Sequence, residues 1–389
     1  MRPKQELLEL EQKFVRLRIV NMADVDVGKF DFDFDTTFAV MVLNHRGQVI
    51  SRYGGRDAQS PESYISMPSL KKALLRSLDL HEKSKGEKGE AVKLPKTLKS
   101  RHAQSYPFVK NVAMRCVHCH DVASAQAMEM FESPAFDLMK DIWLHPEPLS
   151  LGLDLDPGDG ATLRKVTGSA KEAGLVKGDR IVSVNEVPVS TFTDIQYQLH
   201  RLPTDTKSLK IGVKGKEAVT MKLADYWKHS DITWRRLAIR LSPSAGFGGK
   251  PLDAERKAEL GLPKGGFATE VSFLNFSKPA DSPLNDGDII FSVNEVKESK
   301  LTQHAALHIN LTHKVNELVK LGVIRDGKRQ VISLTVSEGP SENRRVMDSD
   351  SRMGRRGMMR GRGGMMRERM RRGEGRGRNR PPEKEEGTE

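Results

Sequence analysis

The sequence lacks several features that would assign it quickly. It contains no run of about 18 apolar residues, so we expect no transmembrane helix. Its opening residues hold no apolar stretch of the kind found in secretory signals, so the chain as given is predicted to lack a signal peptide. It has no Gly-x-Ser-x-Gly motif, which argues against serine-protease chemistry, and no catalytic residue is predicted.

Positive charge is distributed unevenly. The stretch between Asn343 and Arg380 holds fourteen Arg and four acidic residues, so it supplies +10 of the net charge of +12. The rest of the chain is close to neutral, and a nucleic-acid function would depend on this tail alone. With 389 residues, of which 37% are apolar and 30% charged, the chain has the composition of a soluble protein of two or three domains.

The only two cysteines lie in one motif, Cys116-Val-His-Cys-His120. Cys-x-x-Cys-His is the attachment signature of a c-type haem: the thiols form thioethers to the porphyrin, and the His binds the iron. The motif therefore predicts covalent haem c at Cys116 and Cys119, with His120 as the metal ligand. Two alternatives stay open. One is a redox dithiol, and the other is a zinc site that would need His118 or His120 together with His102.

The motif does not determine the second axial ligand of such a haem. Met128 and Met130 lie on the helix expected directly after His120, so they reach the opposite face of a porphyrin less easily than more distant side chains do. The candidates are His102, Met128, Met130, Met139 and His145.

The first 85 residues alternate short helices and strands. The pattern predicts a helix over 5–13, a strand over 14–20, a buried strand over 38–43, a turn at 44–47, a returning strand over 48–53 and a helix from Ser69. This order resembles the later half of a thioredoxin fold. The Cys-x-x-Cys element is absent, and Thr36-Thr37 stands where thioredoxins carry a cis-proline. The resemblance therefore implies a partial thioredoxin-like α/β domain without thiol exchange.

The motif lies in a short segment between this domain and the rest of the chain. Residues 86–101 are rich in Lys, Glu and Gly and are expected to form a solvated linker. In the haem segment, residues 102–148, helices are expected over 122–131 and 136–143. Because the segment is short, neighbouring domains would have to contribute to burying a haem.

The composition changes again from Ser150 onwards. Leu151-Gly-Leu153 is followed by a run from Gly168 to Val187, in which Gly178 makes a tight turn, Asp179 caps it and residues 180–184 form a strand. This run resembles a bacterial PDZ domain of the HtrA type. The resemblance implies a groove in which protein or peptide C-termini bind as an added strand. A packing module that binds no peptide is the alternative. The peptide-binding residues implied are Leu151, Gly152, Leu153, Ile195 and Leu199.

The same pattern recurs. The run 178–187 returns as 287–296, which is 109 positions later. The second copy departs from the first, because Asp281-Ser-Pro-Leu replaces the usual Ala-Gly-Leu. Leu237-Ala-Ile239 stands where the carboxylate-binding loop is expected, with Ala in place of Gly. We therefore expect a second, degenerate PDZ-like domain with an altered or closed groove.

The final residues are of low complexity, rich in Arg, Gly and Met, and are predicted to be disordered. Such a tail could contact anionic surfaces or nucleic acid through its arginines. The expected organisation is α+β and multidomain: a partial thioredoxin-like domain (1–85), a linker (86–101), a small helical Cys-x-x-Cys-His segment (102–148), two PDZ-like β-rich domains (149–227 and 232–338) and a disordered basic tail (339–389).

This arrangement resembles a bacterial family of thioredoxin/PDZ-domain (seleno)proteins. The resemblance implies a truncated N-terminal part, because a UGA codon read as a stop would move the start to Met1. It also implies a periplasmic or otherwise extracytoplasmic protein, although the chain as given lacks a signal peptide. We expect a redox or electron-transfer protein with c-type haem, a redox partner and PDZ modules that bind a protein partner. The alternative is a non-catalytic PDZ scaffold in which the cysteine motif is a dithiol or metal site.

Overall fold

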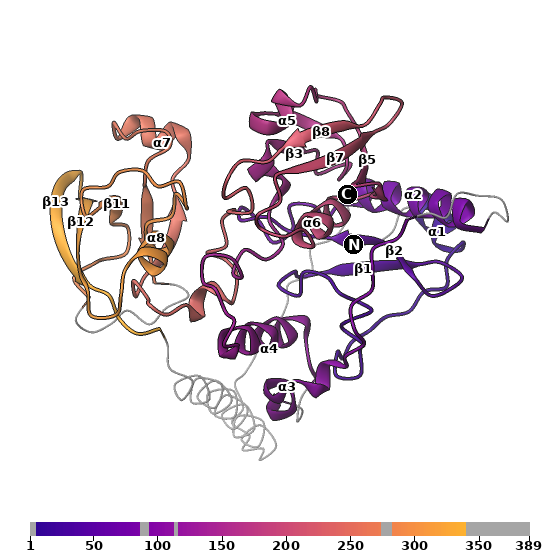
Figure 1. Cartoon of the computed structure of the whole chain (residues 1–389), viewed down its shortest axis with the longest axis horizontal. Coiled ribbons are helices and arrows are strands. Elements are labelled where there is room, and N and C mark those ends of the chain that lie inside the picture. Colours follow the sequence, from indigo (N-terminus) through magenta and orange to yellow (C-terminus); the bar gives the residue numbers. More distant parts are fainter. Residues whose placement is uncertain (1–4, 86–92, 113–115, 274–281, 340–389) are drawn as a thin grey trace, which may run out of the picture. The chain divides into compact units, whose positions relative to one another are not determined.

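The computed structural model describes residues 5–85, 93–112, 116–273 and 282–339 (Figure 1). The described chain is a mixed α/β structure with several small sheets, none of which closes into a barrel. No helix in these ranges is long and apolar enough to cross a membrane. The predicted basic tail lies outside the described residues, except for Gly339.

Eight helices and three single-turn 3-10 helices are described. They are α1 (Gln5–Glu11), α2 (Met67–Lys85), η1 (Ala103–Ser105), α3 (Pro107–Val112), α4 (Cys119–Glu132), η2 (Pro148–Leu151), α5 (Gly168–Glu172), α6 (Phe192–His200), η3 (Ala238–Arg240), α7 (Ala254–Glu259) and α8 (Ala305–Thr312). The strands are β1 (Ala39–Leu43), β2 (Val49–Gly54), β3 (Leu153–Leu155), β4 (Leu163–Val166), β5 (Ile181–Val184), β6 (Val187–Pro188), β7 (Ser208–Val213), β8 (Val219–Lys222), β9 (Gly248–Pro251), β10 (Thr269–Ser272), β11 (Ile289–Val293), β12 (Leu318–Arg325) and β13 (Lys328–Thr335).

The N-terminal part is an antiparallel hairpin with two helices. β1 pairs with β2, and the turn between them is closed by Asn44, whose side-chain oxygen accepts hydrogen bonds from the backbone N–H groups of Arg46 and Gln48. α1 and α2 pack leucines against Val42 and Ile50. The helix over 5–13, the turn at 44–47 and the two strands are therefore present, whereas the thioredoxin-like arrangement stays a prediction.

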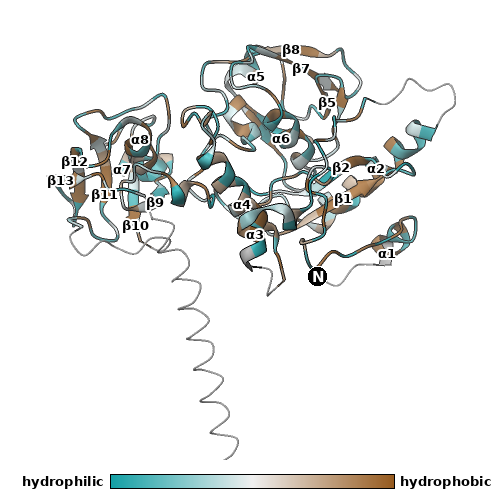
Figure 2. Cartoon of the chain, turned by 60° about the horizontal axis from the view of Figure 1, so that its bottom comes forward, coloured by the Kyte–Doolittle hydropathy of each residue, from teal (hydrophilic) through white to brown (hydrophobic). Residues whose placement is uncertain are grey.

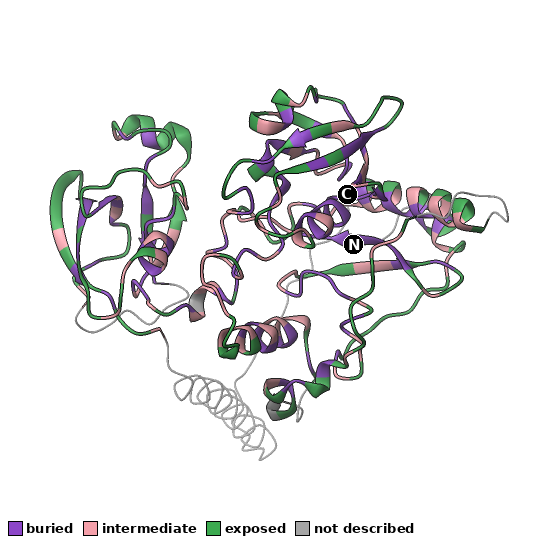
Figure 3. Ribbon diagram, viewed as in Figure 1, coloured by how far each residue is buried: buried purple, intermediate pink, exposed green. Residues whose placement is uncertain are grey.

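Two expectations for this part are wrong. Residues 14–20 form no strand, and Val15 and Leu17 are exposed. A strand needs a neighbour to satisfy its backbone hydrogen bonds, and no described strand pairs with this segment. β1 is not a buried strand, because only Val42 of its five residues is buried. Its apolar residues, brown in Figure 2, are thus largely exposed or half-buried in Figure 3.

One further expectation fails between residues 93 and 143. The described part of the expected linker, 93–101, has no helix or strand and is mostly exposed, and near its end the Ser100 hydroxyl and the Arg101 N–H both donate to the Asp26 carboxylate. α4 is present and longer than expected, but residues 136–143 form turns rather than a second helix. There the Asp141 carboxylate accepts the N–H of Asp137. Such a local side-chain bond competes with the helical pattern.

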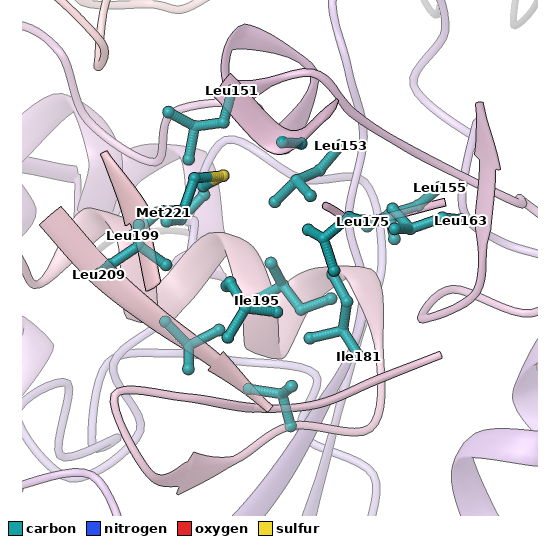
Figure 4. Close-up of a cluster of buried hydrophobic side chains, with 14 of the residues drawn as sticks. Leu151, Leu153, Leu155, Leu163, Leu175, Ile181, Ile195, Leu199, Leu209 and Met221 are labelled. Atoms are coloured by element: carbon teal, nitrogen blue, oxygen red, sulfur yellow. The ribbon is translucent and has the colours of Figure 1, made fainter. Parts of the chain in front are cut away.

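The first β-rich module, defined as residues 148–227, is built around one apolar core. A two-stranded sheet, β3–β4, and a four-stranded sheet of order β6-β5-β7-β8 are joined by a bridge between Thr162 and Arg180. Figure 4 shows leucine, isoleucine and methionine side chains from both sheets and from α6 meeting in this core. Successive side chains of a strand point to opposite faces of the sheet, so every second residue of these strands faces the core.

The second β-rich module, defined as residues 244–337, repeats the turn geometry of the first. Gly178 and Gly287 have φ angles of +92° and +83°, a region that favours glycine, and their N–H groups donate to the carbonyls of Leu163 and Val271. Its five strands form a single sheet of order β13-β12-β11-β10-β9.

The Asn-Glu pairs of the repeat make matching turns. Asn185 and Asn294 have φ of +48° and +47°, and each is followed by a Glu at about +70°. The two Asn side-chain oxygens accept the N–H groups of Lys210 and Lys320, each at 2.8 Å. The sequence repeat is therefore also a structural repeat.

α6 belongs to two neighbouring parts of the fold at once. Seven of its nine residues are buried. Ile195 and Leu199 point into the core of the first module, and α6 also lies against β2 (Figure 1). There the Asp194 carboxylate accepts the Ser51 hydroxyl at 3.0 Å and the Arg52 N–H at 2.7 Å. The first module and the N-terminal hairpin are therefore packed together through this helix.

A buried ion pair ties the segment between the two modules to the N-terminal part. Both Nη atoms of Arg235 lie 2.8 Å from the Asp33 carboxylate, and both side chains are almost fully buried. Burial alone would raise the pKa of Asp33, but the Arg235 guanidinium outweighs it and lowers that pKa to about 2. Arg235 also donates to the carbonyl of His145.

Arg235→Ala should destabilise the protein strongly, because it leaves the Asp33 carboxylate buried without its counterion. We expect a loss of about 3–5 kcal/mol in the free energy of unfolding, measured by urea denaturation. Lys83→Ala is the matched control, because it breaks an exposed ion pair with Asp79. Equal shifts of the two urea midpoints would contradict the importance of the buried pair.

Glu147→Gln should stabilise the protein at alkaline pH. Burial raises the pKa of Glu147 from 4.5 to about 7, so the folded state is increasingly penalised as the pH rises through that interval. A pKa shift of this size corresponds to about 3 kcal/mol. This value is an upper bound for the gain in the free energy of unfolding at a pH of about 8. Urea unfolding at several pH values tests this: the difference from wild type should shrink as the pH falls toward about 5. A pH-independent difference would refute the assignment.

Candidate functional site

The Cys-x-x-Cys-His motif forms the start of α4. Cys119 is the first residue of the helix, and the Asp121 carboxylate accepts the backbone N–H of His118, which caps the helix. Just before it, Val117 is held by backbone bonds: its N–H donates to the Asn21 side chain, and its carbonyl accepts the N–H of Met22. The motif thus has a fixed backbone on both sides of Cys119.

Because Val117 is buried, the side chains of the residues on either side of it point toward solvent. Val117 and Val122 lie almost fully buried in an apolar cluster with Phe32, Phe34 and other side chains. Cys116 and His118 are consequently exposed, while Cys119 and His120 are half-buried. Both cysteines are thiols. The structure therefore places Cys119 and His120 in the first turn of α4, half-buried, and Cys116 in the exposed extended segment directly before it.

The electrostatics of the motif favour the neutral form of the Cys119 thiol. Burial raises the pKa of the Cys119 thiol, and the nearby Asp121 carboxylate adds to the effect. The same carboxylate lies 3.8 Å from Nε2 of His120. The rings of His118 and His120 stack with centroids 5.4 Å apart. An acidic neighbour disfavours a thiolate, so this site differs from a strongly activated dithiol.

The residue types of the motif are those that a covalently attached haem uses. Two thiols, of Cys116 and Cys119, could form thioethers to the porphyrin, and the imidazole of His120 directly follows as a possible iron ligand. Across the described ranges, no group of three or more His, Cys, Asp or Glu side chains is arranged to hold a metal ion. His102, which the zinc alternative would need, has its Nδ1 bonded to the carbonyl of Asp24, an arrangement that leaves the zinc alternative open, because a histidine that ligates through Nε2 commonly makes this bond.

The candidate second axial ligands lie in different surroundings. The ring of His145 is buried and stacks on His200 at 3.9 Å, and burial lowers its pKa to about 4. Met139 accepts the indole N–H of Trp143 at its carbonyl and is half-buried. Met128 is half-buried as well, and Met130 packs against the apolar cluster around Trp143. Of the two histidines, only His102 is exposed.

The residues implied in peptide binding also lie together, but they are buried. Leu151, Gly152 and Leu153 come from η2 and β3, and they share a core with Ile195 and Leu199 of α6 (Figure 4). None of the four apolar side chains is more than 2% exposed. A peptide could therefore use the backbone beside them, whereas the side chains themselves are occupied in packing.

β3 offers such a backbone edge. It is hydrogen-bonded to β4 on one side, and no other described strand pairs with it. The Gly152 carbonyl accepts the Thr167 N–H, which places the groups of Leu153 on the opposite edge. An edge with unpaired N–H and C=O groups is a template for an added strand.

In the second module the corresponding loop is not where the sequence predicts it. Leu237-Ala-Ile239 belongs to the turn around η3, and Leu237 packs with Ile232 and Trp143 outside the module's core. Strand pairing instead matches Gly246, with φ of +70°, to Gly152, with φ of +81°. The sequence signal was the run Ala245-Gly-Phe247, a small-residue loop directly before β9.

In the second module, α8 and the residue before it are hydrogen-bonded to the loop and strand at the edge of the sheet. The Ala245 N–H donates to the Asn310 side chain of α8 at 2.7 Å, and Nε2 of His304 lies 3.1 Å from the Gly249 carbonyl of β9. Both bonds join the helix to the strand and loop where an added strand would lie. The altered or closed groove stays a prediction.

Comparison with known proteins gives little support for assigning this chain to a family. No protein-family model matches the chain, and no curated protein matches it. Matching solved structures include the HtrA-type protease AlgW with decapeptide, at 13% identity and a TM-score of 0.21, and a variant of it with decapeptide, at 14% and 0.22. Each match covers 35% of this chain. The matched part spans less than half of the other chain, 43% of AlgW and 42% of its variant. The similarity is weak.

The two thiols should react at different rates. A variant that keeps only Cys116 (Cys119→Ser) should be alkylated by iodoacetamide on the order of tenfold faster than one that keeps only Cys119 (Cys116→Ser). The reason is that Cys116 is exposed, whereas burial raises the pKa of Cys119. Mass spectrometry follows the reaction, and the rates should converge in urea. Equal rates in the folded proteins would contradict the assigned burial.

Proposed function

We propose that this chain is an extracytoplasmic redox or electron-transfer protein that carries a covalent c-type haem and uses its first β-rich module to bind a protein partner. The observation that carries the proposal is the Cys-x-x-Cys-His motif at the start of α4, with Cys116 exposed just before the helix and Cys119 and His120 in its first turn. A bound haem would supply one-electron transfer at its iron.

The residues of this chain would hold the haem through three side chains. Cys116 and Cys119 would be the covalent anchors, and His120 the axial ligand. The Asp121 carboxylate, near Nε2 of His120, is the nearby acidic group that would influence the basicity of the imidazole. Val117 and Val122 anchor the turn in the apolar cluster, which would keep the three side chains in a fixed relative position.

Partner binding would use the PDZ-like character of the first module. Its unpaired β3 edge beside α6 supports strand addition by the C-terminus of a protein or peptide. The second module would serve in packing, since its helix is bonded to β9. A periplasmic location accompanies covalent haem attachment, and the Arg-rich tail could contact anionic surfaces.

A non-catalytic scaffold that binds protein C-termini is the second candidate. The free edge of β3 favours it, because that feature does not depend on haem. In this case Cys116 and Cys119 would form a dithiol site. The raised pKa of Cys119 would make thiol–disulfide exchange at this site slow. The haem content of the purified protein separates the two candidates.

The full chain should be exported in a bacterium together with a cytochrome c maturation system. After denaturation, the reduced alkaline pyridine spectrum should show about one covalent haem per chain, as the single motif predicts. Cys116→Ala combined with Cys119→Ala should abolish covalent haem, because no thiol remains to form a thioether.

His118→Ala is the matched control for this experiment. It changes an exposed residue inside the motif and leaves both anchors and His120 in place, so covalent haem should be retained. Wild-type protein without covalent haem, at normal yield and with a control cytochrome matured in the same cells, would refute the haem proposal. The scaffold would then be the better description.

A further inference from the structure

The segment 57–66, called here the cover loop, reaches the first module from the N-terminal part. Within it, the ring of Tyr64 stacks on that of Phe192, the first residue of α6, with centroids 3.6 Å apart and planes 8° apart. Tyr64 is only 9% exposed and belongs to the apolar core of the module. A side chain from outside the module therefore completes its core.

Tyr64 also belongs to the same apolar core as Leu153 and Leu155, the first and last residues of β3. Tyr64 thus stacks on α6 and shares a core with β3, the two elements between which an added strand would have to fit.

The cover loop is held by its own bonds. The Asp57 carboxylate accepts the N–H groups of Gln59 and Ser60 and the hydroxyl of Ser63. At the loop's start, the Ala58 N–H donates to Glu147 at 2.8 Å. A preformed loop loses little entropy when it docks, so it competes effectively with a flexible peptide.

α6 cannot easily move aside to widen the space. Its Asp194 is held by Ser51 and Arg52 of β2, and the Thr191 hydroxyl before the helix donates to the Arg52 carbonyl. These bonds are buried, and breaking them would leave charged and polar groups without partners. Apart from the buried Tyr64 ring, the cover loop is held by exposed or part-buried hydrogen bonds, so its release would leave fewer buried polar groups without partners than a shift of α6 would.

We propose that the cover loop, with Tyr64 as its wedge, is an internal cover over the binding edge between β3 and α6, and that a peptide binds the first module only when this loop is displaced. The inference rests on the proposed partner binding and adds its regulation. The apparent affinity for a peptide is then the intrinsic affinity reduced by the fraction of molecules with the loop released.

The test measures binding of short fluorescent peptides of random sequence with free C-terminal carboxylates to the full chain. The best-binding peptide from this pool should bind Tyr64→Ala on the order of tenfold more tightly than wild type, because the wedge is gone. Tyr64→Phe should resemble wild type, since it keeps the stacked ring. The C-terminally amidated peptide should bind more weakly to every variant.

Tyr106→Ala controls for general loosening of the fold. Tyr106 is equally buried, at 5% against 9%, but it lies in the cluster around the cysteine motif. This variant should bind peptide as wild type does. If Tyr64→Ala fails to fold, hydrogen exchange of wild type replaces it: saturating peptide should speed exchange in residues 57–66, and unchanged protection there would overturn the cover.

The outcomes separate the inference from the function on which it rests. Equal affinity of wild type and Tyr64→Ala would overturn the cover while leaving partner binding intact. Failure of every variant to bind any free-carboxylate peptide would overturn partner binding by the first module, and the cover with it. The haem measurement is independent of both results.

Discussion

The hydrogen bonds that Asp194 accepts from β2 are the constraint on which the first module depends. They fix α6 against the N-terminal hairpin while its other face fills the module's core. A helix held on both faces has no freedom to adjust its distance from β3. The position of α6 in the first module is therefore fixed in part by residues of the N-terminal part, and the two parts pack as one unit.

The two β-rich modules show how one repeated sequence can lead to different surfaces. Their turns coincide down to the φ angles of Asn185 and Asn294, because turn chemistry is local. The spaces beside their edge strands differ, because those depend on single side chains. In the second module Asn310 and His304 bond directly to the loop and strand, whereas in the first Tyr64 arrives from another part of the chain.

In the cysteine motif, a locally fixed backbone keeps neighbouring side chains exposed. Val117 is anchored in an apolar cluster, and the alternation of the backbone turns the residues on either side outward. Both features, a rigid start to α4 and accessible thiols, are what covalent attachment of a large planar group would require. The second β-rich module and the cysteine motif thus have separate structural roles, joined through the segment that contains Arg235.

The sequence by itself determined the features that depend on neighbours along the chain. These include the turn at Asn44, the repeated turns after Gly178 and Gly287, and the grouping of the two cysteines with His120. It misplaced the loop before β9, because the matching glycine, Gly246, is recognised only through strand pairing. Only the tertiary structure decided that residues 14–20 lack a strand partner and that Tyr64 packs into the core of the first module. Those outcomes depend on contacts between segments far apart in sequence, such as the bond from Ser51 to Asp194, and residue order alone does not specify which distant surfaces meet.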